Sequence, residues 1–580
     1  MTLTRKSDRP TDTLPSLSRR KWLERMPLSV MAGIGALDVF HGASAFANTM
    51  PQHQGAREAA ELYNVRDFGA TGDGKATDTG AVQAAIDLCA ARGGTVFLPA
   101  GTFRVGAIEL KSNVTLHLSA GATLLGTEQA DQYHAIEQIP LKGDTTLKDG
   151  NWALLYAVRA KNIVIEGNGT INGQGALFRV DTNVSSQPAQ LTGTKRPHHF
   201  LAYQCEGITI RDVRLEDSAY HSIRVIACKR VQINGVYIHS RVNVNNDGFH
   251  FVSSKFVTIS SCTVFSQDDA CALFGSCQFI TVTNCIFSSR WSVFRFGGGS
   301  VKNVAVSNCI LFQVYGCPIK FQGTPGSAFE NVSFTNLILD EVTGPIYVSI
   351  GPPANQSAAD DPPLEDPTKG RLTAVARNIS FENISGTVVS APEPLSDSLI
   401  PTHAYPGESL SCIALSCAPG AVMEGISMSN VHLVFAGGGT REDGERHNLP
   451  FSGGEYFTLG TMPAYGLYAR GVRGLTLQNV RFEVRTADLR PAVILDRVRD
   501  AAINGLTVQS NSMADSALRF VSSEDVLLAQ PRLLTQTESF LQVEGEATNA
   551  IVVDGGDFSK ATVPVRFLGG LPKDVVAMRA

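Results

Sequence analysis

Short apolar segments recur through the middle of this chain at a nearly constant step, and that step limits the possible folds. Val257, Ile280 and Val304 mark equivalent points in three segments rich in β-branched residues, and the step between them is about 23 residues. The step is too short for a strand, a helix and their connections, so each repeat predicts one coil of a β-solenoid. Earlier segments at Ile208 and Val231 keep the same step.

Beyond residue 330 the apolar segments stand farther apart, with steps at least twice as long. The equivalent points in this half are Val332, Ile379, Ile426, Leu475 and Val526. Each long step fits either two coils or one coil that carries a long insertion, and the sequence leaves both open. Residues 351–370, rich in Pro and Asp, and residues 436–460, rich in Gly and charge, have the composition of loops.

Three aspartates stand one repeat apart where the segments are most regular. Asp247 precedes Asp268 and Asp269 by nearly one full step, so the two groups should lie on adjacent coils, about 4.8 Å apart. Clustered carboxylates raise one another's pKa, and they suit cation binding, proton sharing or acid–base catalysis. A Ca²⁺ site or a solvated turn is the alternative, because Asn-Asp-Gly at 246–248 is also ordinary turn sequence.

The order of these residues resembles the polygalacturonase family of glycoside hydrolases, family 28. The signature of that family is Asn-Thr-Asp, Asp-Asp, Gly-His-Gly and Arg-Ile-Lys. This chain has Asn-Asn-Asp at 245–247, Asp-Asp at 268–269 and a final lysine at Lys320. The resemblance extends over most of 63–480, and it implies an all-β fold, a right-handed single-stranded parallel β-helix.

The resemblance also implies a role for each aspartate. Asp268 would protonate the leaving oxygen, and Asp247 with Asp269 would activate the attacking water. An oxocarbenium-like transition state needs one protonated and one ionised carboxyl group, and mutually repelling aspartates supply both forms near neutral pH. We therefore expect an inverting O-glycosyl hydrolase, without a cofactor, that cleaves a pectin-related glycan of galacturonan or rhamnogalacturonan type.

The chain departs from the family signature at the histidine and at the arginine. Residues 289–296 stand where the family has its histidine, and Pro318 replaces the arginine. The family uses both missing residues around its uronate subsite, so a different sugar or linkage is left open. A tryptophan beside an arginine suits a sugar ring and a uronate carboxylate, by stacking and by paired hydrogen bonds. The substrate-binding residues that we predict are Arg290, Trp291, Arg295, Lys320, His250 and His221.

Each of these residues also has a structural alternative. If Phe294 and Phe296 point inward, alternation turns Trp291 and Arg295 toward the face of the aspartates. Trp291 can instead pack under a loop, and Arg295 can pair with a local acid. An exposed lysine is usually only solvated, and a histidine at a strand end is more often structural.

The position of His250 is also set by alternation. His250 lies between Phe249 and Phe251, so alternation should turn its side chain outward, near Asp247.

The start of the chain predicts an export signal and a cap. Residues 1–47 contain Arg19-Arg20, a modest apolar run and a final Ala-Phe-Ala typical of a cleavage site, so we expect a twin-arginine signal peptide and a periplasmic or secreted protein. Residues 48–62 should form a linker and residues 63–580 the β-helix catalytic domain. The amphipathic segment 78–91 resembles the capping segment of pectinase-type β-helices, and this resemblance implies a helix that covers the open N-terminal end of the solenoid.

Composition and cysteine spacing narrow the partners. The net charge of −5 argues against nucleic acid, and no segment is apolar enough for a membrane span in the processed protein. Cysteines repeat at the coil step, as at Cys262, Cys285 and Cys309, which predicts a buried ladder, and the odd total of 11 leaves at least one free thiol. The chain lacks the Cys and His spacing of zinc sites. We expect a monomer that binds a polysaccharide or oligosaccharide and no metal.

Two other functions stay open at this point. A β-helix polysaccharide lyase or epimerase would hold Ca²⁺ with the aspartates and use Arg290 or Lys320 as the base. A non-catalytic carbohydrate-binding β-helix would keep the tryptophan and the arginine but would not require three acids.

Replacing Arg19 and Arg20 together by lysine should leave the precursor in the cytoplasm, because the twin-arginine route recognises the arginine pair. Fractionation of cells that express the full-length chain, followed by immunoblotting, locates the protein. Export of the double variant at the wild-type level would show that residues 1–47 are not a twin-arginine signal.

Overall fold

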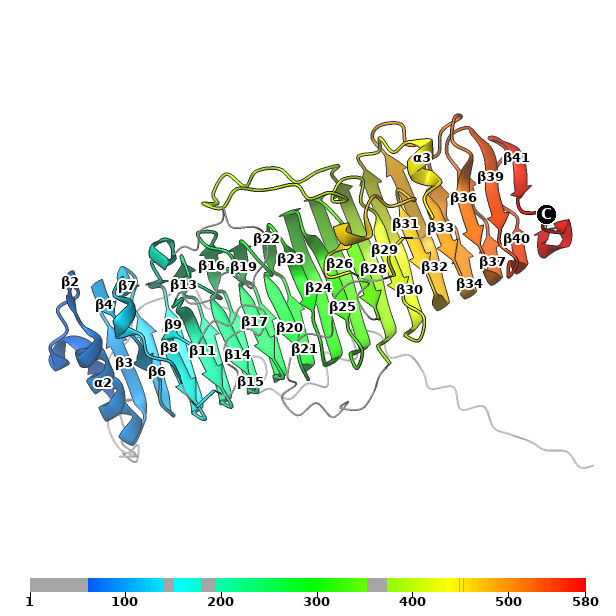
Figure 1. Cartoon of the computed structure of the whole chain (residues 1–580). Coiled ribbons are helices and arrows are strands. Elements are labelled where there is room, and N and C mark those ends of the chain that lie inside the picture. Colours follow the sequence, from blue (N-terminus) through cyan, green and yellow to red (C-terminus); the bar gives the residue numbers. More distant parts are fainter. Residues whose placement is uncertain are drawn as a thin grey trace, which may run out of the picture. The chain divides into compact units, whose positions relative to one another are not determined.

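The computed structural model describes residues 61–136, 138–139, 151–178, 195–351, 373–447, 449–451 and 453–579. The signal peptide predicted at 1–47 and nearly all of the 351–370 insertion lie outside the described residues. Residues 60–580 form one compact unit, and its coils stack side by side as a parallel β-helix (Figure 1).

Two sheets, here named sheet A and sheet B, run along this β-helix, and the strands in both pair in parallel. Sheet B contains β5 Ile108–Glu109, β8 Ala153–Val158, β11 His198–Tyr203, β14 Ile223–Ile226, β17 Phe249–Val252, β20 Cys271–Phe274, β23 Ser292–Phe296, β25 Cys317–Gly323, β27 Ile346–Ile350, β29 Ile413–Cys417, β31 Leu467–Arg470, β33 Val493–Asp496, β36 Ser516–Val521, β39 Thr537–Glu544 and β41 Ala561–Phe567.

From β5 onward, each coil passes once through sheet B and then through sheet A. Its path in sheet A is one long strand or two short ones, except in the last two coils, where it is one short strand. Sheet A contains β1 Leu62–Asn64, β2 Asp73–Thr77, β3 Gly94–Leu98, β4 Gly101–Val105, β6 Val114–Leu118, β7 Ala122–Gly126, β9 Lys161–Gly167, β10 Thr170–Asn172, β12 Glu206–Arg211, β13 Arg214–Glu216, β15 Lys229–Asn234, β16 Tyr237–Ser240, β18 Lys255–Ser260, β19 Thr263–Ser266, β21 Gln278–Thr283, β22 Ile286–Ser289, β24 Ser300–Val314, β26 Ala328–Val342, β28 Val375–Val388, β30 Val422–Phe435, β32 Val472–Val484, β34 Arg499–Asn504, β35 Thr507–Val508, β37 Glu524–Ala529, β38 Arg532–Leu533, β40 Asn549–Asp554 and β42 Val576–Arg579.

The helices are short and lie outside the two sheets. They are α2 Thr79–Arg92, α3 Arg441–Gly444 and the 3-10 turns η2 Val65–Phe68, η3 Ala130–Gln132, η4 Gly175–Phe178, η6 Tyr456–Leu459 and η7 Lys573–Val575. Among the described residues, no helix combines the length and the apolar character that a bilayer crossing demands. A helix is present close to the predicted 78–91: α2 buries Val82, Ala85, Ile86 and Cys89 beside the first strands. Its capping role stays a prediction.

The register between coils confirms the repeat inferred from the sequence. Val257 of β18 lies opposite Ile280 of β21, and Ile280 lies opposite Val304 of β24. In this part of the chain, one step of the sequence repeat therefore corresponds to one coil of the β-helix.

The register also resolves the long steps. Val332 lies opposite Ile379, and Ile379 lies opposite Ile426, so each of these double-length steps is one coil that carries an insertion. Leu475 instead lies opposite Ala501, and Ala501 lies opposite Val526. The last long step in the sequence therefore corresponds to two coils.

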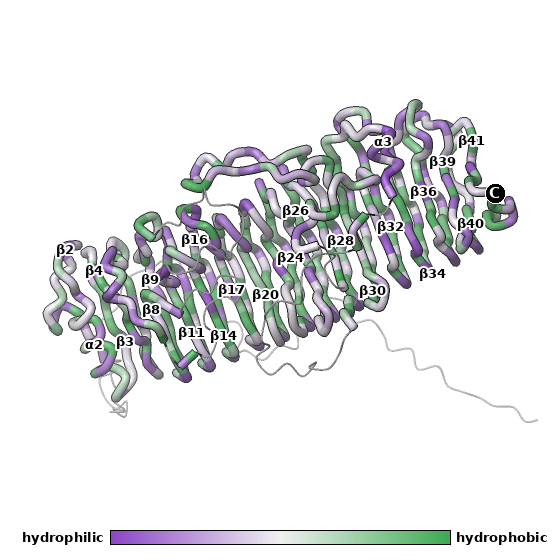
Figure 2. Tube along the Cα trace, viewed as in Figure 1, coloured by the Kyte–Doolittle hydropathy of each residue, from purple (hydrophilic) through white to green (hydrophobic). Residues whose placement is uncertain are grey.

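Alternating side chains fill the space between the two sheets with apolar residues. Phe294 and Phe296 are buried in the core, as the predicted alternation requires, and both pack edge-on or at an angle to Phe334. Phe334 in turn stacks on Phe381 of the next coil at 5.6 Å. Figure 2 shows the same alternation as apolar and polar bands along the coils.

Ladders of identical side chains mark the coil corners and the core. All 11 cysteines are buried without a disulfide, and the backbone N–H of Cys262 donates to Sγ of Cys285 on the next coil, so the predicted cysteine ladder is confirmed. Asparagines form a second ladder where the long strands of sheet A bend, because asparagine tolerates the left-handed conformation better than most residues. Asn383, Asn430 and Asn479 have φ near +54° and each donates Nδ2 to the asparagine one coil earlier.

Phe334→Ala should lower the free energy of unfolding by about 3 to 5 kcal/mol, because it removes a fully buried ring from a packed stack. Phe279→Ala is the matched control: this ring is 46% exposed, and its loss should cost less than about 1 kcal/mol. Urea denaturation followed by circular dichroism measures both. Equal effects of the two substitutions would contradict the placement of Phe334 in the core.

Candidate active site

The three aspartates lie at one corner of the β-helix, where the chain leaves sheet A and enters sheet B. Asp247 stands just before β17, and Asp268 and Asp269 stand just before β20, the next strand of sheet B. The backbone N–H of Gly248 donates to the carbonyl of Asp269 at 3.0 Å, which places the two turns on adjacent coils. The adjacency predicted from the spacing of the aspartates is therefore observed.

Asn246 fixes the turn that carries Asp247. This side chain is fully buried, and its Oδ1 accepts hydrogen bonds from the backbone N–H groups at 242–243, at 3.1 and 2.7 Å. Its Nδ2 donates to the carbonyls of Ser218 and Tyr220 on the preceding coil, at 2.8 and 2.9 Å. An asparagine with four satisfied hydrogen bonds in a buried turn leaves Asp247 a single well-defined position.

Three of the predicted substrate-binding residues share one column of sheet B. The register runs from His250 through Ala272 and Arg295 to Lys320 on successive coils. The alternating residues of the same strands are core residues, so this column lies on the outer face, beside the aspartate turns.

Asp268 is the aspartate best placed to carry a proton. Its Oδ2 accepts from Nδ2 of Asn245 at 3.1 Å, and its Oδ1 accepts from the backbone N–H of Asp269 at 2.9 Å. Burial, followed by repulsion from the charge of Asp269, raises the pKa of Asp268 to about 7, although the Lys320 ammonium acts in the opposite direction. At neutral pH this carboxyl group is therefore available in both protonation states.

Asp247 is buried beside two histidines. Its Oδ2 lies 2.7 Å from Nδ1 of His250 and 3.7 Å from Nε2 of His221. The His250 ring is stacked between His221, at 4.3 Å, and Phe274, at 5.1 Å, which holds its Nδ1 toward the carboxylate. Burial lowers the pKa of His221 well below its usual range, so this imidazole stays neutral. Both histidines thus lie beside Asp247. Alternation in the sequence had predicted this position for His250 only.

His221, Asp247 and His250 are also the residues here that can hold a metal ion. Their potential ligand atoms lie within 4.8 Å of one another, and two imidazoles with a carboxylate are a donor set that zinc accepts. The prediction that the site uses no metal stays a prediction.

The two carboxylate oxygens of Asp269 have different surroundings: one faces Arg295, and the other has no hydrogen-bond donor among the described residues. Its Oδ2 lies 3.8 Å from Nε of Arg295, and its Oδ1 is buried and accepts no hydrogen bond from the described residues. A buried carboxylate oxygen without a donor can accept a hydrogen bond from a water molecule or a sugar hydroxyl. Arg295 also donates to Gln322 and to the carbonyl of Phe296, so it pairs with a local acid and a local amide.

Arg290 is placed as an anchor for a loop. Its side chain is buried, its Nη1 and Nη2 lie 3.1 and 3.2 Å from the carboxylate of Glu408, and it also donates to the carbonyls of Tyr315 and His403. A buried guanidinium that already makes four hydrogen bonds through Nη1 and Nη2 has little capacity left for a substrate carboxylate. The position fits a structural role better than the predicted contact with substrate.

Lys320 is likewise held by an acid from a loop. Its Nζ donates to both carboxylate oxygens of Glu455, at 2.8 and 2.7 Å, and the lysine side chain is 3% exposed. Glu455 directly precedes η6 in the segment that connects β30 to β31.

Three aromatic rings from separate segments meet beside these pairs. Trp291 lies 5.6 Å from Tyr405 and 6.0 Å from Phe457, and Tyr405 stacks on Phe457 at 4.8 Å with nearly parallel planes. All three rings are partly exposed. Packing of Trp291 under a loop was one structural alternative, and here two loops supply its neighbours.

The segment 389–412, between β28 and β29, is the part of the site that sequence reasoning missed. It runs back over earlier coils (Figure 1), where the backbone N–H of Leu399 donates to the carbonyl of Arg241 and Ser398 donates to Gln267. It supplies Tyr405 and Glu408. In the sequence, only the double-length step from Ile379 to Ile426 indicated an insertion here. No local sequence pattern shows against which coils such a loop packs.

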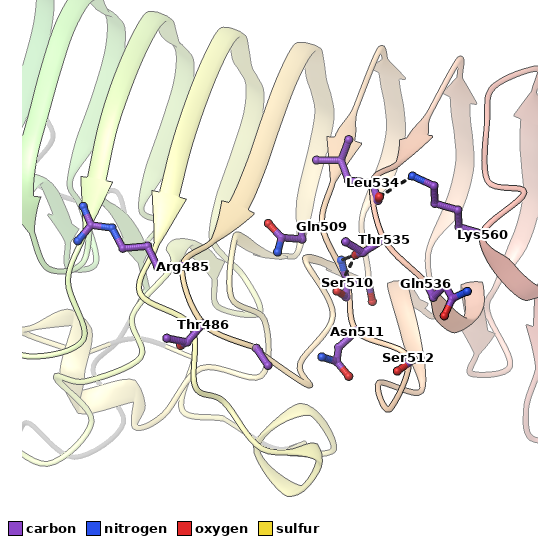
Figure 3. A pocket seen from close by; sticks show the side chains of 11 residues that line it. Arg485, Thr486, Gln509, Ser510, Asn511, Ser512, Leu534, Thr535, Gln536 and Lys560 are labelled. Atoms are coloured by element: carbon purple, nitrogen blue, oxygen red, sulfur yellow. Dashed lines mark hydrogen bonds between the residues drawn. The ribbon is translucent and has the colours of Figure 1, made fainter.

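A separate pocket of about 510 Å³ lies several coils beyond the aspartates (Figure 3). Its lining includes Arg485, Gln509, Asn511, Gln536 and Lys560 but no carboxylate. A pocket without an acid cannot supply the proton donor and the base that glycoside hydrolysis requires, so the aspartate corner remains the candidate active site.

Asp268→Asn should remove a pH dependence from the stability of the protein. Since the pKa of Asp268 is raised from 3.8 to about 7, the folded chain keeps a proton that the unfolded chain releases between these values. The wild type should therefore lose up to about 4 kcal/mol relative to the variant as the pH rises from about 4 to about 7. Urea unfolding of both proteins across this range measures the difference, and a difference independent of pH would contradict the raised pKa.

The chain is similar in sequence to known glycoside hydrolases. The profile of the family described as Glycosyl hydrolases family 28 matches residues 90–396, more than half of the chain. An exo-poly-alpha-D-galacturonosidase of Dickeya chrysanthemi is 25% identical over 388 residues, which cover 56% of this chain and 63% of that protein. An exopolygalacturonase of Platanus acerifolia is 24% identical over 350 residues, which cover 58% of this chain and 85% of that protein.

The fold is also found among solved structures. A hyperthermoactive exopolygalacturonase from Thermotoga maritima superposes with a TM-score of 0.54 at 17% identity, over 73% of this chain and 92% of that one. The predicted right-handed parallel β-helix is thereby confirmed. This chain belongs to family 28 of the glycosyl hydrolases, a family of O-glycosyl hydrolases.

Proposed function

We propose that this protein releases sugar units from pectic polysaccharides or oligosaccharides by inverting hydrolysis. The observation that carries the proposal is the aspartate corner, where one carboxyl group has a pKa of about 7 and two further carboxylates stand beside it. Membership of family 28 supports glycoside hydrolysis as the reaction class. The twin-arginine pattern at Arg19-Arg20 supports export, where such a substrate would be met.

Asp268 is the proposed general acid. In its protonated form it gives its proton to the glycosidic oxygen as the bond to the anomeric carbon breaks. The carboxylate left behind is stabilised by two hydrogen bonds, from the amide of Asn245 and from the backbone N–H of Asp269. These donors lower the cost of the charge that appears on Asp268 during the reaction.

Asp247 and Asp269 are proposed to act together as the general base that activates the attacking water. The free Oδ1 of Asp269 can accept one hydrogen of the water, and Asp247 takes the proton that the water loses. His250 orients the Asp247 carboxylate through the bond of 2.7 Å, and it is a positioning residue in this scheme. Water that enters opposite the leaving oxygen inverts the anomeric carbon.

Action from the end of a glycan chain is the favoured mode. Two insertions, 389–412 and 436–466, pack over the coils that carry the aspartates and Lys320, and they wall the site on the outer face. Two of the similar proteins are named as exo-acting enzymes. A walled site admits a chain end more readily than the middle of a polymer.

The test is to follow hydrolysis of pectic oligosaccharides by proton NMR, with and without a chelator. The first-formed sugar should be saturated, should have the inverted anomeric configuration, and should appear at the same rate with chelator present. Asp268→Asn should lose activity by about a thousandfold, because it removes the proposed proton donor to the leaving oxygen. Asp500→Asn, an exposed aspartate far along the solenoid, should keep wild-type activity.

Three outcomes would contradict the proposal. An unsaturated uronate would indicate a lyase, and retention in the first-formed sugar would exclude single displacement. Activity of the Asp268→Asn variant within about tenfold of wild type would remove Asp268 from the role of acid.

A further inference from the structure

The cations around the aspartate corner are matched by carboxylates of the protein itself. Lys320 is buried, and both oxygens of Glu455 hold its ammonium. The Glu455 side chain is 27% exposed and that of Lys320 only 3%, so a ligand that approaches this column meets the carboxylate first. A negatively charged ligand would be repelled there instead of attracted.

The two arginines beside Lys320 also have partners within the protein, although only Arg290 is hydrogen-bonded to a carboxylate. Arg290 is paired with Glu408, with both side chains buried, and Arg295 lies beside Asp269 and donates to Gln322. On the far side of Asp247 two further guanidiniums stand near the buried histidines, Arg196 at 0% and Arg224 at 2% exposure, so neither presents its charge to solvent. Within the described part of the chain, no exposed cation thus stands ready at this corner for a substrate carboxylate.

A free uronate would therefore enter the corner at a cost. On the Lys320 side of the corner, the charges of Glu408, Asp269 and Glu455 balance those of Arg290, Arg295 and Lys320. The negative charge of Asp247 is in turn offset by Arg196 and Arg224, whose charges act on the neighbouring His221. Removing a carboxylate from water without supplying a partner is expensive, and like charges nearby add to the expense.

The exposed surface beside these pairs suits an uncharged ring. Trp291, Tyr405 and Phe457 form a partly exposed aromatic cluster, and an aromatic cluster can pack against the C–H face of a pyranose without requiring a charge on the sugar. The backbone N–H of Ala270 donates to the carbonyl of Ser292 at 2.9 Å, so the turn that carries Trp291 lies on the coil next to Asp268 and Asp269. Burial raises the pKa of Tyr405, and its hydroxyl remains a neutral donor for a sugar oxygen.

We infer that the sugar unit seated at this corner is an uncharged pyranose, such as a neutral hexose or a 6-deoxyhexose, and that Glu455 determines this specificity by neutralising Lys320. The inference rests on the proposed glycoside hydrolysis and adds the class of sugar that the site selects. Glu455 acts through Lys320 and through its own exposed carboxylate, without a part in bond cleavage.

The test compares three pectic oligosaccharides that differ in the terminal unit. One is an oligogalacturonide with a free uronate end, the second is the same molecule with that carboxyl group reduced to the alcohol, and the third is a rhamnogalacturonan oligosaccharide with a 6-deoxyhexose end. Wild-type kcat/KM on at least one neutral end should exceed that on the uronate end by at least tenfold. Glu455→Gln should narrow this ratio at least tenfold by freeing Lys320.

Glu483→Gln is the matched control, since Glu483 forms comparable ion pairs with Arg481 and His432 on sheet A and should leave the ratio unchanged. Thermal melting of both variants checks that they fold. A uronate end cleaved as well as the neutral ends would overturn the inference and leave the proposed hydrolase standing. Failure to cleave any of the three would overturn both.

Discussion

The residue-for-residue register of sheet B is the constraint on which the rest of the structure depends. Each coil hydrogen-bonds in parallel to the one before, so positions one repeat apart in the chain, such as Asp247 and Asp269, become neighbours. A slip of one residue would exchange the two faces of every strand, turning His250 and Lys320 into the core and core phenylalanines outward. The buried aromatic stacks and the cysteine and asparagine ladders all oppose such a slip. The relative position of the three aspartates is therefore fixed by the pairing of the coils.

The same register explains how much the sequence could predict. Where coils lack insertions, Val257, Ile280 and Val304 reveal the period directly, and adjacency of the aspartates follows by counting. Counting residues along the repeat could not identify the carboxylates that pair with Arg290 and Lys320. Glu408 lies 118 residues from Arg290, and Glu455 lies 135 residues from Lys320, each in an insertion that no period positions. Sequence patterns thus located the basic side chains on the correct face but could not show that they were already paired.

The surroundings of Asp247 illustrate a second limit. The family signature has a histidine after the aspartate pair, and this chain lacks it there, yet His250 lies 2.7 Å from Asp247. Alternation along β17 predicted that His250 faces outward near this aspartate. It could not predict the stack with His221 and Phe274 that fixes the ring, because the stack depends on side chains from three coils. A histidine beside the proposed base Asp247 is thus present, but it comes from a different position in the chain.

Charge matching at the corner connects substrate choice to the protonation of the acid. Lys320 alone would lower the pKa of Asp268 and would favour release of the proton before catalysis, whereas Glu455 acts in the opposite direction. In a site built for a uronate, the carboxylate of the bound sugar can itself offset the lysine when it arrives. A neutral sugar brings no such charge, so the protein has to supply it. Glu455 occupies the place where that charge is needed, and one ion pair can thereby both exclude an acidic sugar and keep Asp268 protonated for a neutral one.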